Sequence, residues 1–221
     1  MSIRSRYEKE LKGISDNLVL MCRHIETAME KCVTALVDRD FDLAYEVFED
    51  EKLIDKMERD IEQSCLRILL MESPVAGDFY EVTAALKMIT DLERIGDQVR
   101  DIAEITTQFG DEEYIKKLEH IPQMAVIAIQ MVKDGVHAYI NRDLALTRTL
   151  DKTDDKVDDL FNTVMSDLTE LIRKNPDNAE QAINLMMITK YLERIGDHAV
   201  NIGDWVEYAI TGERPESKGL K

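Results

Sequence analysis

The segment Leu-Glu-Arg-Ile-Gly-Asp occurs twice in the chain, at residues 92–97 and again, unchanged, at residues 192–197. A shorter match accompanies it, because the pair Arg39-Asp40 has a counterpart in Arg142-Asp143. Matching segments at a nearly constant separation indicate an internal repeat. The sequence therefore predicts one structural unit that is used twice, with a boundary near residue 110 of the 221.

Helical periodicity runs through both copies of this unit. Apolar residues recur at steps of three and four, which is typical of helices that bury one face. Asp40 is placed to cap one helix, and Ser73-Pro74 and Asn175-Pro176 are placed to end two others. The pattern predicts six helices, at about residues 3–37, 41–71, 78–109, 111–141 with a restart near Pro122, 143–174 and 177–211.

The fold class follows from this pattern. Only 9 Gly and 4 Pro interrupt the chain, and β-branched residues do not alternate as they do in strands. Each helix with one apolar face needs neighbours to cover it, and three antiparallel helices with short loops provide them. We expect an all-α protein of two tandem, pseudo-symmetric three-helix bundles, residues 1–110 and 111–221, with a frayed tail from residue 213 onward.

The charge and the cysteines limit the classes of function. The formal net charge is −17, and such a surface repels the phosphates of nucleic acids and anionic lipids, so neither is an expected partner. The longest apolar run, residues 125–132, is too short to cross a bilayer. No signal-peptide pattern opens the chain, and its three cysteines form no Cys-x-x-Cys pair. These features predict a cytoplasmic protein with reduced thiols.

Acidic residues follow the repeated segment at helical spacing. Glu93 and Asp97 lie one turn apart on one helix face, and Asp101 extends this row by another turn. The preceding helix carries Glu51 and Asp55 at the same spacing. If the two helices fold back at the turn between them, Glu51 lies level with Asp97 and Asp55 with Glu93. The first half is therefore predicted to bring two acidic rows together.

The second half repeats this arrangement. Its matching residues are Asp154, Asp158, Glu193, Asp197 and Asn201, the last in place of the acid at Asp101. Carboxylates clustered across a helix contact repel one another unless a cation, water or a basic side chain lies between them. A solvated acidic face is the alternative, because pairs of acids at this spacing are common in so acidic a chain.

The ligand type limits the metal. Carboxylate oxygens are hard donors that suit magnesium, calcium, manganese or iron, with zinc as a further candidate, and no cysteine accompanies them. The surplus of acid suggests more than one ion per site. His198 projects off the acidic row. Arg94 and Arg194 are expected to pair with nearby acids or to meet a partner, and Gly96 and Gly196 to allow close approach of a neighbouring helix.

The repeated Glu-Arg-Ile-Gly-Asp segments, each with an acidic pair upstream, together with residues 198–202, resemble the PhoU family over nearly the whole chain. The resemblance implies two three-helix bundles with metal clusters on the motif carboxylates. It also implies negative regulation of high-affinity phosphate uptake, through contact with the ATPase of the phosphate ABC transporter and with the phosphate sensor histidine kinase. The metal ligands that it implies are Glu51, Asp55, Glu93, Asp97, Asp101, Asp154, Asp158, Glu193, Asp197 and Asn201.

Three functions remain open at this point. The first is a regulatory adaptor without enzymatic activity, in which metals organise the surface and a homodimer is a candidate state. The second is a metal-dependent hydrolase that uses the clustered carboxylates to activate water. The third is a helical scaffold that binds no metal. The sequence offers no obvious further acid, base or set of phosphate-binding Arg and Lys beside the carboxylates, which favours the first function over the second. It also contains no Walker loop, no G-x-S-x-G and no H-E-x-x-H motif.

Overall fold

The structure is a computed structural model that describes residues 3–71, 76–110 and 113–215. Within these residues the chain forms six α-helices and two short 3-10 helices, and no strand. The α-helices are α1 Ile3–Asp38, α2 Phe41–Met71, α3 Ala76–Thr106, α4 His120–Asn141, α5 Leu144–Lys174 and α6 Ala179–Thr211. The 3-10 helices are η1 Thr107–Phe109 and η2 Pro176–Asn178. The predicted all-α class is confirmed.

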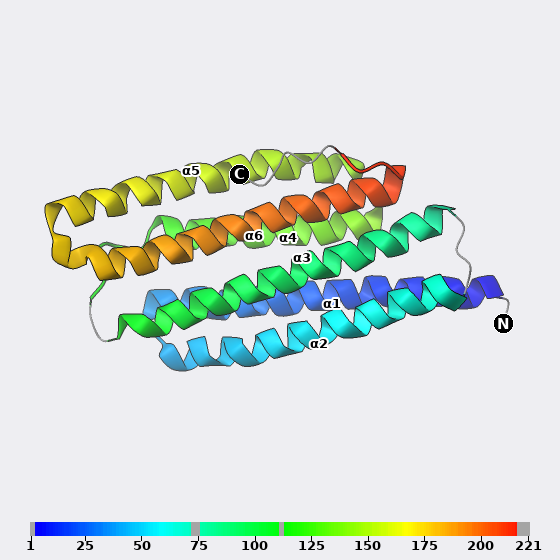
Figure 1. Ribbon diagram of the computed structural model, residues 1–221, viewed down its shortest axis with the longest axis horizontal. Helices are drawn as coiled ribbons and strands as arrows, with labels where there is room; N and C mark the ends of the chain where they lie inside the picture. The colour runs from blue at the N-terminus through cyan, green and yellow to red at the C-terminus, as the bar shows by residue number, and fades with distance from the viewer. Residues whose placement is uncertain (1–2, 72–75, 111–112, 216–221) are drawn as a thin grey trace.

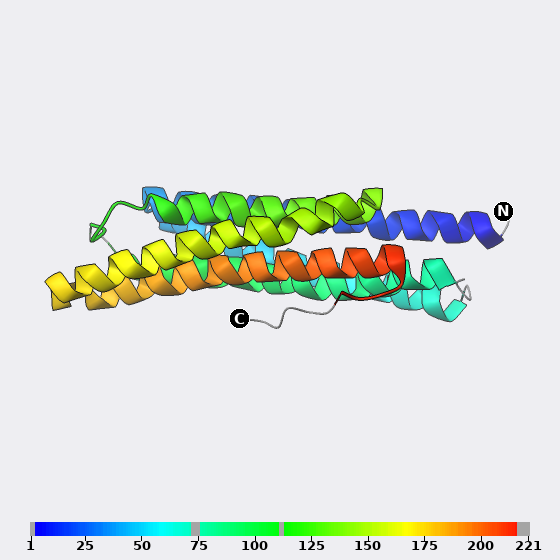
Figure 2. The ribbon, with the colours of Figure 1, turned by 90° about the horizontal axis from the view of Figure 1, so that it is seen from above.

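The six helices run along one elongated body (Figure 1). Helices α3 and α6 lie side by side in the middle of the view, flanked by α2 and α5, while α1 and α4 cover the opposite side, as Figure 2 shows. Contacts within α1–α3 and within α4–α6 form two three-helix units, and the α3–α6 contact joins them. The buried apolar side chains of both units belong to one continuous cluster.

The junction between the first two helices of each unit has the same backbone geometry. Arg39 (φ +61°) and Arg142 (φ +53°) both adopt the left-handed conformation, which ends the preceding helix. The next residue caps the following helix: Asp40 Oδ1 accepts a hydrogen bond from the Leu43 N–H, and Asp143 Oδ1 accepts two such bonds. The duplication seen in the sequence is therefore also a duplication of structure.

The predicted start of the fourth helix is wrong. We expected a helix from residue 111, whereas α4 begins at His120 and the described residues before it are not helical. The side chain of Gln181 binds this segment, accepting a hydrogen bond from the Ile115 N–H and donating one to the Glu113 carbonyl (3.1 Å). Pro122 lies in the first turn of α4, where its missing N–H costs nothing, instead of inside a longer helix.

Smaller differences occur at other helix ends. The third predicted helix ends in the 3-10 turn η1, and the sixth is preceded by η2, in which the Asn175 side chain accepts a hydrogen bond from the Asp177 N–H (3.2 Å). In the predicted frayed tail, the guanidinium of Arg214 lies 4.0 Å from the centre of the Trp205 ring. Residues 216–221 lie outside the described part of the chain.

The cysteines are structural. Cys22, Cys32 and Cys65 are all buried and form no disulfide with one another. Burial raises the pKa of each thiol to about 12, so the reactive thiolate is disfavoured. No helix within the described residues is both long enough and apolar enough to cross a membrane.

Candidate metal centre

The first carboxylate cluster lies between α2 and α3. Glu51 and Asp55 stand one turn apart on α2, and Asp97 reaches the same level from α3, so the predicted alignment of Glu51 with Asp97 is present. One oxygen from each of these three carboxylates lies within 4.8 Å of the other two. All three side chains are half-buried. Such a set of converging oxygens offers a hard cation three ligands from two helices.

The acids of this cluster destabilise one another's charged forms. Burial raises the pKa of Glu51, and the neighbouring charge of Asp55 raises it further. Burial also raises the pKa of Glu93, with Asp97 as the second cause and Asp55 as a smaller one. Because each carboxylate is partly withdrawn from water and faces other negative charges, a cation placed among them would relieve both effects.

Glu58 is an acid of this cluster that the sequence analysis missed. It lies one turn beyond Asp55, and burial, then the charge of Glu62, raise its pKa. Its charge also contributes to the raised pKa of Glu93 on α3. The signal was present in the sequence, because residues 51, 55 and 58 follow the i, i+4, i+7 pattern of one helix face. The search was for an acid followed by an aspartate four residues later, and it missed Glu58, which lies three residues after Asp55.

Arginines surround the first cluster on its solvent side. Arg94 contacts Asp97 (3.1 Å) and Glu93 (3.5 Å), which confirms its expected pairing with nearby acids. Arg59 lies 3.7 Å from Asp55. The predicted ligand Asp101 is not part of the converging group, since it accepts a hydrogen bond from Arg100 (2.7 Å). Its charge also contributes to the raised pKa of Tyr191 on α6, so Asp101 faces the second repeat.

The second set of acids also lies on one side of its bundle, between α5 and α6. Burial and then Glu193 raise the pKa of Asp197, and Asp158 on α5 adds to this shift. The carboxylate of Asp154 lies against α6, because a Cβ atom built on Gly196 would be 2.7 Å from its Oδ1. A metal site needs ligand atoms from carboxylate, thiol or imidazole groups close together. Among the described residues, however, only the first cluster brings three such atoms within 4.8 Å of one another.

Two residues of the second half point elsewhere. Asn201, a predicted ligand, donates a hydrogen bond through Nδ2 to Asp91 Oδ1 of α3 (3.4 Å). His198 Nδ1 lies 2.9 Å from the same oxygen. Both side chains therefore join the two repeats across the α3–α6 contact. This partner was not predicted, because the sequence pattern shows which residues share a helix face and not which helix from the other repeat covers it.

Glycine allows the close helix contacts at both clusters. A Cβ atom on Gly96 would lie 3.0 Å from the Cγ2 of Ile54 on α2, and one on Gly196 would meet Asp154 on α5. The expected role of these two glycines is confirmed. Each of them brings the acid-bearing faces of two neighbouring helices closer together than a larger residue would allow.

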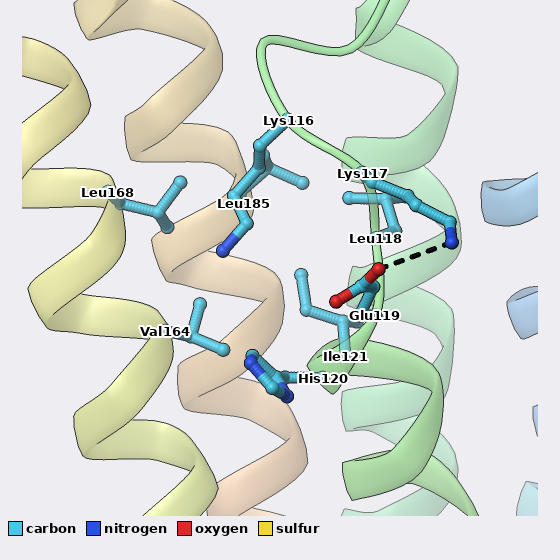
Figure 3. A pocket seen from close by; sticks show the side chains of 9 residues that line it. All are labelled: Lys116, Lys117, Leu118, Glu119, His120, Ile121, Val164, Leu168 and Leu185. Carbon is cyan, nitrogen blue, oxygen red and sulfur yellow. Dashed lines mark ion pairs between the residues drawn. The ribbon is translucent and has the colours of Figure 1, made fainter.

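Two cavities among the described residues lie away from the predicted metal ligands. Figure 3 shows a small one between the start of α4 and helices α5 and α6, with His120 near Val164 and Ile121. Its volume is about 10 Å³, and the Nδ1 of His120 is buried with no hydrogen-bond partner among the described residues. A hollow of about 530 Å³ lies beside the segment before α4 and η2. Neither is lined by a predicted metal ligand.

Comparisons with known proteins place these features in a family. The PhoU domain family matches residues 18–106 and 121–206, one match in each repeat. A phosphate-specific transport system accessory protein PhoU homolog of Clostridium acetobutylicum is 30% identical over 212 residues, covering 96% of this chain and 97% of that protein. The corresponding homolog of Aquifex aeolicus is 32% identical, covering 96% of each chain.

Solved structures agree with these matches. The crystal structure of PhoU from Pseudomonas aeruginosa superimposes with a TM-score of 0.89 at 30% identity, covering 94% of this chain and 100% of that one. The phosphate transport system regulatory protein PhoU from Streptococcus pneumoniae has the same fold, with a TM-score of 0.89 at 21% identity over 96% of this chain and 100% of that one.

Proposed function

This chain belongs to the PhoU domain family, and from that premise we propose that it is a negative regulator of high-affinity phosphate uptake that binds metal and acts as an adaptor. The relatives named above are accessory proteins of phosphate-specific transport. The observation that carries the metal part of the proposal is the convergence of the Glu51, Asp55 and Asp97 oxygens within 4.8 Å.

The metal would be held by Glu51, Asp55 and Asp97, with Glu93 and Glu58 beside them. The donors are carboxylates, so the candidates are iron, manganese, magnesium and zinc, in one or more ions. The bound ion would supply positive charge to a surface that the acids alone leave strongly negative. The other predicted ligands, Asp101, Asp154, Asp158, Glu193, Asp197 and Asn201, remain predictions.

An adaptor role fits the surroundings of the first cluster better than hydrolysis does. A hydrolase acting on phosphate esters needs cationic side chains that are available to hold the substrate's phosphate. Here Arg59, Arg94 and Arg100 are each engaged with an acid of this region. With a formal net charge of −17, the chain is suited to partners that present basic surfaces. The partners we propose are the ATPase of the phosphate ABC transporter and the phosphate sensor histidine kinase.

Metal binding is tested by replacing the converging acids. We expect the double variant Glu51→Gln with Asp97→Asn to lose the metal that the wild type takes up during purification without chelator, measured by elemental analysis. The matched control is Asp155→Asn with Asp159→Asn, which removes two exposed acids at the same spacing on α5. Equal metal content in both double variants would contradict the assignment. Circular dichroism checks that both variants keep the helical fold.

The regulatory role is tested in the host cell. Deletion of the gene should switch on a phosphate-starvation reporter in medium with ample phosphate, and the wild-type gene should restore repression. Purified protein should bind the transporter ATPase in a pull-down, and size-exclusion chromatography of the same sample distinguishes a monomer from a homodimer. Release of phosphate from phosphate esters with added Mn²⁺ or Mg²⁺, lost in the double variant Asp97→Ala with Asp197→Ala, would contradict the adaptor role and favour a hydrolase.

A further inference from the structure

The two carboxylate clusters differ at one level of the bundle. Residues of the third helix of each unit correspond at a difference of 100 in residue number, so Asp97 matches Asp197. On the second helix the difference is 103, so Asp55 matches Asp158. At the next level, the first repeat has Glu58 on α2 and Thr90 on α3. The corresponding residues of the second repeat are an aromatic residue, Phe161, and a base, Lys190.

Lys190 places its ammonium group within the second cluster. Its Nζ lies 2.6 Å from Oε2 of Glu193 and 5.6 Å from the centre of the Phe161 ring. The side chain of Glu193 is 10% exposed, against 25% for Glu93 in the first cluster. The charge of Lys190 also acts on Asp197, whose pKa it lowers against the stronger effects of burial and Glu193.

We propose that Lys190 is the resident cation of the second carboxylate cluster, so that the protein binds metal at the first cluster and not at the second. This inference rests on the proposed metal binding at Glu51, Asp55 and Asp97. A metal ion at Glu193 would have to displace the ammonium group and then lie beside it, and the repulsion of the two cations would oppose binding.

Phe161 holds the ammonium group in place. A cation over an aromatic face is stabilised by the ring's negative face, and Phe161 provides this contact from α5. The acid at the matching position, Glu58, instead adds negative charge to the first cluster, where it contributes to the raised pKa of Glu93. The substitutions at the two positions therefore act in the same direction: one cluster gains an acid, and the other gains a base with a ring that binds it.

The arginines beside the converging acids of the first cluster, Arg59 and Arg94, are more exposed than Lys190, with side-chain exposures of 59% and 55% against 42%. Water therefore screens the charges of Arg59 and Arg94 somewhat more than that of Lys190, whose partner Glu193 is only 10% exposed. Arg94 and Arg194 occupy the same position of the two repeats, but Arg94 contacts Asp97 and Glu93, whereas the charge of Arg194 acts on Tyr191. Among the described residues, three ligand atoms converge at the first cluster and not at the second. This agrees with metal binding at the first cluster alone.

The test measures metal by elemental analysis after saturation with Mn²⁺ and removal of the unbound ion. We expect Asp97→Asn to remove all bound manganese and Asp197→Asn to leave the wild-type amount. Lys190→Met keeps the apolar stem against Phe161 and removes the charge, and should raise the manganese content about twofold. The exposed Lys156 of α5 provides the control, since Lys156→Met should change nothing.

The reciprocal change gives a second measurement that does not depend on creating a new site. Thr90→Lys places a base where the first repeat has none, and should abolish manganese binding while circular dichroism shows an intact helical fold. Equal losses of metal in Asp97→Asn and Asp197→Asn would overturn this inference and leave the proposed metal centre standing. A wild type that takes up no manganese would overturn the proposed centre itself.

Discussion

Glu51 and Glu93 are the residues at which the chemistry of the first cluster is most directly measurable. Burial, and next the charge of a neighbouring aspartate, raise the pKa of both side chains above the ordinary value of 4.5. A carboxyl group whose pKa is raised by folding contributes stability that is fully present below its unfolded pKa. That contribution is lost as the pH rises through the raised pKa of the folded state.

The melting temperature of metal-free protein should therefore fall as the pH is raised from about 4.5 toward 7. Thermal melts followed by circular dichroism in the presence of chelator measure this slope. The double variant Glu51→Gln with Glu93→Gln should have a shallower slope, because amides do not ionise. A saturating divalent metal at pH 7 should raise the melting temperature of the wild type and not of the variant. Identical slopes in the two proteins would contradict this account.

At the residue scale, the sequence predicted the acids that meet and the pairing of Arg94 with them, but not the role of Lys190. Helix geometry alone predicted that Glu51 and Asp55 share one face of α2 and lie at the same height as Asp97. Lys190 was not singled out, because its role depends on the position of Phe161 on another helix. A search for positions at which the two repeats carry different kinds of residue could have found Lys190 and Phe161.

At the scale of the helices, glycine marks the places where two of them approach most closely. A Cβ atom on Gly135 of α4 would lie 2.9 Å from Cγ2 of Ile202 on α6, which is fully buried. A β-branched side chain in a packed core has little freedom to move away. Gly13 of α1, by contrast, has no atom within 4 Å of the corresponding position.

Alanine at these two glycines should change the free energy of unfolding in opposite directions. Gly13→Ala should stabilise the protein by about 0.5–1 kcal/mol, because alanine restricts the unfolded chain more than glycine does. Gly135→Ala has the same helical gain but must push Ile202 aside, at a cost of about 1–3 kcal/mol, so a net loss is expected. Urea unfolding measures both values. A gain at Gly135 equal to that at Gly13 would show that α4 and α6 are not in the contact described.

The helices themselves were largely predictable, and the exception has a physical reason. Five of the six starts and all six ends lie within a few residues of the predicted ones, because apolar periodicity and capping residues are local signals. The residues before α4 are instead bound by Gln181 of α6, which hydrogen-bonds the backbone at Glu113 and Ile115, and Pro122 lies in the first turn of the helix. Nothing in the sequence near residue 111 could indicate a partner from another helix.

At the scale of the whole molecule, the contact between the repeats is as much a part of the core as the contacts within them. Ala84 and Ala85 are adjacent on α3, so their side chains point in different directions. Both are nevertheless fully buried, because α3 is covered on more than one side. Polar contacts between the repeats include Lys133 with Glu26 and His198 with Asp91. The repeated sequence predicted the two units, but not their packing, because a repeat pattern contains no information on which faces of the units meet.

Because the buried side chains form one cluster, we expect both repeats to unfold in a single transition. Leu18 of α1 and Leu168 of α5 are each fully buried, one in each repeat, and provide a matched pair of substitutions. Leu18→Ala and Leu168→Ala should each lower the free energy of unfolding by about 2–5 kcal/mol. For a chain of this size, a loss of 1 kcal/mol lowers the melting temperature by about 2–4 °C.

Scanning calorimetry distinguishes one unit from two. If the repeats unfold together, either substitution moves the whole heat-absorption peak, and the calorimetric enthalpy equals the van't Hoff enthalpy. If each bundle unfolds by itself, Leu18→Ala splits the peak and moves only the part that belongs to residues 1–110, while Leu168→Ala moves the other part. A split peak would mean that the α3–α6 contact is a surface between independent domains, across which metal binding in one repeat could not stabilise the other. A single peak would mean that an ion bound near Glu51 stabilises α5 and α6 as well.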